Sequence, residues 1–435
     1  MMKNYDIDID GAGPGGYVAA IKAAQLGAKV ALIEKEYIGG VCLNIGCIPT
    51  KSLIKSAKVY KDIINGDNYG IDVDVSSVKP NMKKIVNRKN GIVNKLTSGV
   101  KFLLEKNGVK VFNGYGSVKD NNTVIVGEDI LTTENIIIAT GASPIIPPIP
   151  GVKEAYSNNV LMTSKEALSL SEIPQKLAII GGGVIGIEFA SIYSNLGTEV
   201  TILERLDNIL VNVDDEIRDT LLKTLKKNKV KIITKANVSS INDKEITYQL
   251  EGKDTLIKVD KILLAVGMKP NVEDFKHLNL DITKQGINVN DKMETNIKGI
   301  YAIGDVTGKI MLAHVASSQG IVAVENIMGK VKQMDYSKIP SCIYGYPEIA
   351  MIGITEQTAK NQNLDYKVSK FPVAASGKAL ADGEFEGFIK IIVDKEYGEL
   401  LGMHIIASNA TELISEGIMT MELEGTVFDM AKAVH

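Results

Sequence analysis

Two glycine-rich segments follow one plan, and this duplication constrains the fold more than any other feature of the sequence. The first reads Gly11-Ala12-Gly13-Pro14-Gly15-Gly16, and the second reads Gly181-Gly182-Gly183-Val184-Ile185-Gly186. Each follows a short strand, opens a helix and leads to a second strand that ends in an acid, Glu34 or Glu204, 23 residues beyond the first glycine. One G-x-G-x-x-G is weak evidence, whereas two in the same context predict two Rossmann-like dinucleotide-binding folds.

The residue types in these loops suit a nucleotide. Glycine permits the tight turn and the close approach of backbone to a pyrophosphate, which meets the amide donors and the positive dipole end of the helix. An acid at the end of the second strand accepts hydrogen bonds from the adenosine ribose hydroxyls. Because an acid also repels a 2′-phosphate, Glu204 favours NAD over NADP.

A pair of cysteines, Cys42 and Cys47, lies a few residues beyond the first loop. The chain holds only three cysteines in 435 residues, and its start leads into a strand rather than a signal peptide, which favours a reducing cytoplasm where structural disulfides are rare. Two thiols beside a dinucleotide site predict a disulfide that opens and closes in turnover. The alternative is a pair of packed structural thiols, and we interpret the third cysteine, Cys342, as one of that kind.

The composition is that of a multidomain globular protein. A chain of 435 residues suggests two to four domains. The formal net charge of −3 offers no electrostatic case for nucleic acid or an anionic membrane. No apolar run approaches the roughly 20 residues of a membrane span. We therefore expect a cytoplasmic protein that binds neither nucleic acid nor membrane.

These features resemble the two-dinucleotide-fold flavoprotein disulfide reductases (the pyridine nucleotide-disulfide oxidoreductase family) over essentially the whole chain. The segment Cys42-Leu43-Asn44-Ile45-Gly46-Cys47-Ile48-Pro49-Thr50-Lys51 is most similar to the dihydrolipoamide dehydrogenase branch. Besides the two loops and their acids, the resemblance rests on Ala139-Thr140-Gly141, Glu188, Gly304-Asp305, Leu312-Ala313-His314 and Ile339-Pro340.

The resemblance implies an α/β fold with two Rossmann-like dinucleotide-binding domains and a C-terminal α+β dimerisation domain. We predict an FAD-binding domain in two parts, 1–147 and 269–337, an NAD-binding domain at 148–268, and a dimerisation domain at 338–435. A buried strand at Ile136–Ile138 and a Pro-rich stretch at 144–150 mark the first junction.

Roles for single residues also follow from the resemblance. Cys42 would meet the substrate and Cys47 the flavin, while Lys51 would lie near the flavin N5 and pair with Glu188; these four are the implied catalytic residues. The implied FAD contacts are Gly11, Gly13, Gly16, Glu34, Lys51, Gly141, Asp305, His314 and Ala316. The implied NAD contacts are Gly181, Gly183, Gly186, Glu204 and Gly267. No metal is implied.

The implied activity is oxidation of dihydrolipoyl groups by NAD through the disulfide and FAD. The implied partners are a second copy of the chain and a lipoyl-bearing protein or domain of a 2-oxo acid, acetoin or glycine-cleavage complex. Two alternatives stay open: another disulfide or metal-ion reductase of the family, and a non-catalytic flavoprotein assembly subunit.

The sequence departs from the family pattern in two places. The family carries a His-Pro-Thr-x-x-Glu acid/base motif near its C-terminus, and by position His435 matches the histidine that precedes this motif. We therefore expect a shortened sequence and impaired turnover of the chain as printed. In the first strand, Asp8 and Asp10 bring carboxylates towards a core where unpaired charge is costly, so they are paired, protonated or unfavourable to FAD binding.

Overall fold

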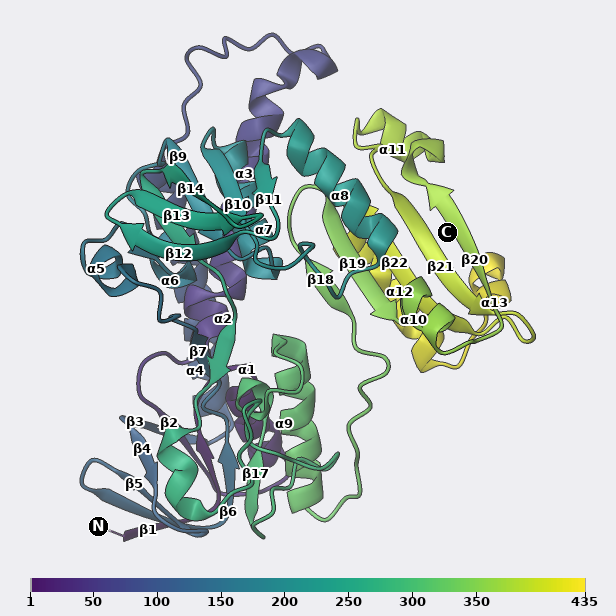
Figure 1. Cartoon of the computed structure of the whole chain (residues 1–435). Helices are drawn as coiled ribbons and strands as arrows, with labels where there is room; N and C mark the ends of the chain where they lie inside the picture. Colours follow the sequence, from purple (N-terminus) through teal and green to yellow (C-terminus); the bar gives the residue numbers. More distant parts are fainter. Residues whose placement is uncertain (1, 435) are drawn as a thin grey trace. The chain divides into compact units, whose positions relative to one another are not determined.

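The computed structural model describes residues 2–434, which divide into two compact units (Figure 1). The first unit is built from the chain up to Ser52 together with Asn87–Ile145 and Gly267–Asp335. The second is built from Leu53–Val86, Ile146–Val266 and the chain from Tyr336 onward. His435 lies outside the described residues.

The first unit is organised by a mixed sheet whose parallel part runs in the order β3-β2-β1-β6, with β17 on the far side of β6. The antiparallel strands β5 and β4 extend the sheet from the other end of β6. Side chains of β1 are buried on both faces, as expected of a central parallel strand. The strands are β1 (Met2–Asp10), β2 (Val30–Glu34), β3 (Lys110–Asn113), β4 (Gly116–Val118), β5 (Thr123–Val126), β6 (Asp129–Ile138) and β17 (Ile300–Ala302).

Helices α1 and α9 pack together in the first unit and lie side by side in Figure 1. The two helices approach each other closely at Gly320 of α9, where a Cβ would press on the Gly15 carbonyl oxygen of α1. The remaining elements are α1 (Pro14–Gln25), α2 (Gly40–Ile45), α9 (Ala313–Ile327), the 3-10 turns η2 (Glu273–Leu278) and η3 (Gly304–Thr307), and the small β7–β16 ribbon (Ala142–Pro144 and Met268–Pro270). Helix α3 (Cys47–Ile64) begins in this unit and ends in a segment assigned to the second, whereas α4 (Met82–Lys106) begins in a segment of the second unit and ends in the first.

The second unit repeats the parallel plan in the sheet β11-β10-β9-β15-β8. Helix α7 follows β9 as α1 follows β1, and each of these two helices has 12 residues. The elements are α5 (Val152–Ser157), β8 (Leu161–Met162), α6 (Ser164–Ala167), β9 (Lys176–Ile180), α7 (Val184–Asn195), β10 (Glu199–Leu203), α8 (Asp215–Lys227), β11 (Lys231–Ile233) and β15 (Lys261–Leu264). An antiparallel sheet of β12 (Asn237–Asn242), β13 (Glu245–Leu250) and β14 (Lys253–Lys258) is inserted between β11 and β15.

The C-terminal part of the second unit is an antiparallel sheet in the order β18-β19-β22-β21-β20, with α12 packed on β19 and β22 (Figure 1). The strands are β18 (Ser341–Ile343), β19 (Glu348–Gly353), β20 (Tyr366–Pro372), β21 (Phe388–Asp394) and β22 (Leu400–Ala407). The helices are α10 (Glu356–Asn361), α11 (Gly377–Ala381), α12 (Ala410–Glu422) and α13 (Val427–Lys432). Two Rossmann-like folds and an α+β C-terminal region are thus confirmed.

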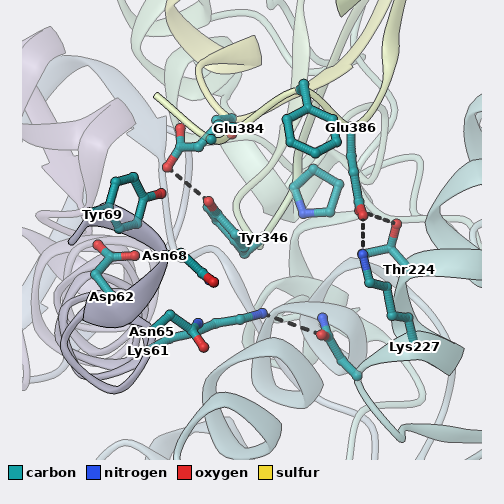
Figure 2. A pocket seen from close by; sticks show the side chains of 15 residues that line it. Lys61, Asp62, Asn65, Asn68, Tyr69, Thr224, Lys227, Tyr346, Glu384 and Glu386 are labelled. Carbon is teal, nitrogen blue, oxygen red and sulfur yellow. Dashed lines mark hydrogen bonds and ion pairs between the residues drawn. The ribbon is translucent and has the colours of Figure 1, made fainter. Parts of the chain in front are cut away.

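Helices α3 and α4 are separated by a 3-10 turn (η1, Gly66–Tyr69) and a non-helical segment. The end of α3, the end of α8 and the loop after α11 line a polar cavity within the second unit (Figure 2).

Among residues 2–434, no helix has the length and apolar character needed to cross a membrane.

Candidate functional site

The first glycine loop has a backbone that tolerates no larger residue at its key positions. Gly11 has φ +110°, and a Cβ there would overlap the Ala139 carbonyl oxygen. A Cβ on Gly16 would overlap the carbonyl oxygen of Gly11 itself. Gly13 caps α1 in an extended conformation, which leaves the first amides of the helix directed at the space beyond the loop.

The second loop repeats this geometry. Gly181 also has φ +110°, and its Cβ would overlap the Ala265 carbonyl oxygen. A Cβ on Gly186 would overlap the Gly181 carbonyl oxygen, and Gly183 caps α7 as Gly13 caps α1. The structure therefore places all six predicted loop glycines at equivalent positions in two separate folds.

The two acids hold the loops through equivalent hydrogen bonds. Glu34 Oε2 accepts the Ala12 backbone N–H at 2.8 Å, and Glu204 Oε2 accepts the Gly182 backbone N–H at 2.6 Å. The second oxygen of each carboxylate accepts a backbone N–H two residues further on, at 2.7 Å for Glu34 and 2.8 Å for Glu204. Each carboxylate is thereby oriented at the rim of its glycine loop.

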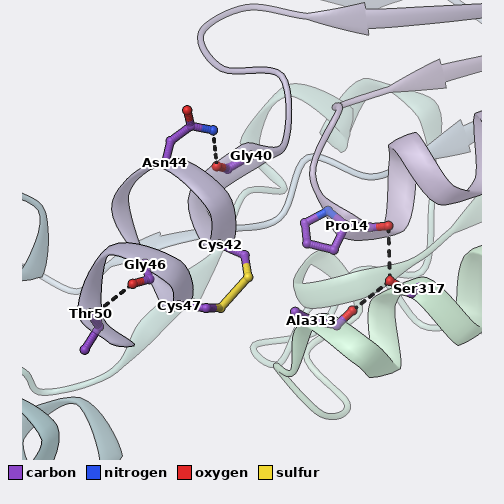
Figure 3. Close-up of a disulfide and its surroundings, with 9 residues drawn as sticks. All are labelled: Pro14, Gly40, Cys42, Asn44, Gly46, Cys47, Thr50, Ala313 and Ser317. Atoms are coloured by element: carbon purple, nitrogen blue, oxygen red, sulfur yellow. Dashed lines mark hydrogen bonds between the residues drawn. A yellow bond between two sulfur atoms is a disulfide. The ribbon is translucent and has the colours of Figure 1, made fainter. Parts of the chain in front are cut away.

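Cys42 and Cys47 form a disulfide with a Cα–Cα distance of 4.6 Å (Figure 3). Cys42 lies on α2 and Cys47 is the first residue of α3, with Gly46 between the two helices. The local turn is fixed by side chains, because Asn44 Nδ2 donates to the Gly40 carbonyl at 2.8 Å and Thr50 Oγ1 donates to the Gly46 carbonyl at 2.6 Å. This disulfide confirms the predicted pairing.

The position of Cys47 at the start of an 18-residue helix has a chemical consequence. The positive end of the helix dipole stabilises a thiolate placed there. Such stabilisation would make the Cys47 sulfur the better leaving group when a thiolate attacks Cys42. The helix boundary therefore supports the predicted difference between the two sulfurs.

A second group of predicted residues gathers around η3 and the start of α9. The Asp305 carboxyl lies in η3, where burial raises its pKa to about 6. Ala316 is buried beside Gly15 and Gly304. Gln319, which the sequence reasoning missed, has a side chain only 1% exposed and accepts the Gly304 N–H at 2.6 Å. Ser317 was also missed; its hydroxyl lies 3.3 Å from the Pro14 carbonyl oxygen (Figure 3).

The remaining predicted residues lie on several elements of the two units. Gly141 has φ +67° and accepts the Asn271 N–H, while Gly267 has φ +117° and accepts the Ile145 N–H. His314 is exposed near the start of α9. Lys51 belongs to the first unit, one helical turn beyond Cys47, and Glu188 belongs to the second. Glu188 is buried on α7 and accepts the Tyr344 N–H at 3.0 Å. The pairing of Lys51 with Glu188 stays a prediction.

The two aspartates of β1 are both buried. Asp8 is 0% exposed, in register between Ala31 and Ile136, and neither of its carboxyl oxygens has a hydrogen-bond partner among residues 2–434. Burial raises its pKa to about 7. Burial, and then the nearby Glu34 carboxylate, raise the pKa of Asp10 to about 7 as well. Of the expectations for Asp8, the structure supports protonation rather than pairing.

Comparison with known proteins agrees with this geometry. The pyridine nucleotide-disulphide oxidoreductase family matches residues 5–320, and the dimerisation domain of the same family matches residues 339–435. The chain therefore belongs to the pyridine nucleotide-disulphide oxidoreductases, flavoprotein enzymes that use FAD and NAD.

Individual relatives share most of the chain. It is 51% identical to a dihydrolipoyl dehydrogenase of Acholeplasma laidlawii over 75% of this chain and 97% of the relative. It is 42% identical to the dihydrolipoyl dehydrogenase of Mycoplasma pneumoniae over 99% of this chain and 95% of the relative. Among solved structures, the HOCl-induced flavoprotein disulfide reductase RclA from Escherichia coli, as its Cu(II) complex, matches with a TM-score of 0.89 and 28% identity over 100% of this chain and 96% of that one.

Proposed function

We propose that the protein is a dihydrolipoyl dehydrogenase, which oxidises protein-bound dihydrolipoyl groups with NAD through the Cys42–Cys47 disulfide and FAD. The observation that carries the proposal is the disulfide at the start of α3 in a chain with two nucleotide loops of matching geometry. The relatives that bear the name dihydrolipoyl dehydrogenase at 42% identity or more support the substrate class.

The residues fit the two cofactors. A Cβ on Gly13 would meet only the Gly40 Cα at 4.0 Å, and a Cβ on Gly183 would meet nothing within 4 Å. The space beside these two helix caps is therefore open to a pyrophosphate. Gly11, Gly13, Gly16 and Glu34 would hold FAD, with Gly141, Asp305, His314, Ala316 and Lys51 as further contacts. Gly181, Gly183, Gly186 and Glu204 would hold NAD, with Gly267 as a further contact. When bound, the two cofactors would supply a two-electron acceptor for the reduced cysteine pair and a final hydride acceptor, respectively.

The chain's own sulfur chemistry begins with a thiolate of the dihydrolipoyl group. The thiolate attacks the Cys42 sulfur, a mixed disulfide forms, and the bond to Cys47 breaks so that its thiolate leaves. The second substrate thiol then attacks the substrate sulfur that is bonded to Cys42, and the bond to Cys42 breaks. The cyclic disulfide is released, the proton of the second thiol passes to the Cys42 sulfur, and both cysteines are left reduced. The Cys47 thiolate is held by the helix N-terminus, and Lys51 and Glu188 would supply a cation and its partner near it.

The assembly partners follow from the same proposal. The segment 339–435 matches a dimerisation domain, and we infer a homodimer. The substrate would be carried by a lipoyl-bearing protein or domain of a 2-oxo acid, acetoin or glycine-cleavage complex.

The decisive experiment measures NAD reduction by free dihydrolipoamide, with Cys42→Ser compared against Cys342→Ser. Cys342 is the one cysteine outside the disulfide, so its substitution controls for loss of a thiol. We expect Cys42→Ser to abolish turnover while the protein still binds FAD, and Cys342→Ser to match the rate of the unsubstituted chain. Retained activity in Cys42→Ser would refute the proposed role of the disulfide.

The same assay and its reverse, NADH oxidation with an added acceptor, separate the alternatives. A non-catalytic assembly subunit would bind FAD but show no NAD reduction with any dithiol. A metal-ion reductase would instead oxidise NADH with Cu(II) faster than with lipoamide. We expect lipoamide to be the better acceptor, and the opposite preference would move the protein to the metal-ion reductases of the family.

A further inference from the structure

The polar cavity in the second unit, with a volume of about 330 Å³, is not used by the proposed function. Its size falls within the range of small-molecule sites. Figure 2 shows side chains from the end of α3, the end of α8 and the loop after α11 converging on it. The lining residues on which its chemistry depends are Lys61, Asp62, Lys227, Tyr346, Glu384 and Glu386.

The carboxylates of this cavity already have cationic partners. Glu384 lies 2.5 Å from the Lys58 ammonium and accepts the Tyr346 hydroxyl at 2.8 Å. Asp62 lies 3.4 Å from the same Lys58. Glu386 lies 2.5 Å from the Lys227 ammonium, and the Thr224 hydroxyl donates to it at 3.4 Å. None of these acids needs a ligand cation for charge compensation.

Lys61 differs from Lys58 and Lys227, which pair with the acids of the cavity. Its ammonium donates to the amide oxygen of Asn228 at 3.3 Å and lies 5.2 Å from the centre of the Tyr346 ring. It forms no ion pair with any carboxylate in the described chain, although its side chain is partly buried. Burial lowers the pKa of Lys61. An ammonium has three N–H donors, and one neutral amide oxygen cannot satisfy all of them. This partly buried cation can therefore bind further acceptors.

We propose that this cavity binds a small organic monocarboxylate, whose carboxylate pairs with the Lys61 ammonium. An incoming carboxylate supplies the charge-assisted hydrogen bonds that Asn228 cannot. The three acids around the cavity disfavour a dianion such as phosphate, because the extra charge would face like charge at short range. Tyr69, Tyr346 and Phe385 line the same cavity, so an aryl or short aliphatic body has apolar surface to contact.

The first test measures amine labelling of the FAD-loaded, full-length protein by reductive methylation, with each lysine quantified by mass spectrometry. Benzoate is the probe, and benzamide is its neutral match. We expect benzoate to slow labelling of Lys61 by about tenfold, the effect of one charge-assisted hydrogen bond, while Lys227 keeps its rate. Equal protection by benzamide, equal protection by inorganic phosphate, or no protection at saturating benzoate would each overturn the proposal.

The second test detects benzoate itself by saturation-transfer NMR. Lys61→Met keeps the length of the side chain and removes its charge, so the benzoate signal should disappear. Lys176→Met removes an exposed charge from the same unit and should leave the signal unchanged. Thermal unfolding and the FAD absorbance of both variants check that the fold is intact. A benzoate signal that persists in Lys61→Met would overturn the assignment of this cavity.

Discussion

The Lys390 ammonium lies 2.9 Å from the Asp214 carboxylate, and both side chains are almost completely buried, at 1% and 2% exposure. Lys390 lies on β21 of the C-terminal sheet, and Asp214 caps the N-terminus of α8 in the second Rossmann-like fold. Glu216 and Glu356 each approach the same ammonium to 2.7 Å. One buried cation therefore joins three elements of the second unit.

Removing this cation should destabilise the second unit strongly. Lys390→Met leaves the buried Asp214 carboxylate without its counterion, and breaking such a pair costs about 3–5 kcal/mol. Lys370→Met is the matched control, because Lys370 pairs with the same Glu216 but is 48% exposed, and we expect a loss of about 1 kcal/mol or less. Urea unfolding of both variants measures the difference, and comparable losses would show that the buried pair has no special role.

Glu204 should govern the choice of pyridine nucleotide. Glu204→Gln removes the negative charge but keeps an acceptor for the Gly182 N–H. We expect KM for NAD to rise about tenfold, because one charge-assisted hydrogen bond to the ribose is lost, and activity with NADP to improve. Glu34→Gln makes the equivalent change in the first fold and should weaken FAD retention without altering the NAD/NADP ratio. An unchanged ratio in Glu204→Gln would contradict this role.

Asp8 should make the folded protein less stable as pH rises. Its pKa is about 7 in the folded chain against 3.8 for an ordinary aspartate, so the unfolded chain loses this proton first. Stability from this group is complete below pH 3.8 and declines as pH rises through about 7, by about 4 kcal/mol in total. Asp8→Val should remove that slope and raise the melting temperature at pH 8.

Asp8→Asn is the control for this prediction, because an amide cannot ionise but is still polar. We expect it to abolish the slope with a smaller gain in stability, since a buried polar group without a partner remains costly. Melting temperatures measured by differential scanning calorimetry from pH 5 to 8 distinguish the two variants. A wild-type slope retained in both would assign the pH dependence to other groups.

His404 should make the folded protein less stable as pH falls, the opposite of the pH dependence expected from Asp8. It is 1% exposed, its Nε2 lies 2.9 Å from the Ile354 carbonyl oxygen, and its Nδ1 has no partner in the described part of the chain. Burial lowers its pKa below the ordinary 6.5, so below that pH the unfolded chain takes up a proton that the folded chain resists. Stability from His404 is therefore present above pH 6.5 and is lost as pH falls. His404→Leu should flatten the acid limb of unfolding curves.

The local conformation of the candidate site could be predicted well from the sequence. The positive φ of Gly11 and Gly181, the caps at Gly13 and Gly183, and the acids at Glu34 and Glu204 all arise within strand-turn-helix-strand segments. The Cys42–Cys47 disulfide likewise closes over a separation of five residues. Such features depend on backbone sterics and short-range hydrogen bonds, which neighbouring residues determine.

Contacts between segments that are far apart in the sequence could not be predicted from it. Gln319 supports the Gly304 turn, Glu188 accepts the Tyr344 N–H, and Lys61 donates to Asn228. The family resemblance names Glu188 but not this contact, and no periodicity or motif marks Gln319 or Lys61. The sequence pattern of a polar side chain on a helix is the same whether that side chain faces solvent or a distant segment.

The sequence by itself determined two Rossmann-like folds, their glycine loops and acids, and a redox-active cysteine pair. Each of these features depends on residues that are close together in the sequence. Only the tertiary structure decided which charges are paired. It enclosed Lys390 with three carboxylates, left both oxygens of Asp8 without a partner, and gave Lys61 an amide rather than an acid. The physical reason is that burial and ion pairing depend on which distant segments come together, and this is set by packing of the whole chain.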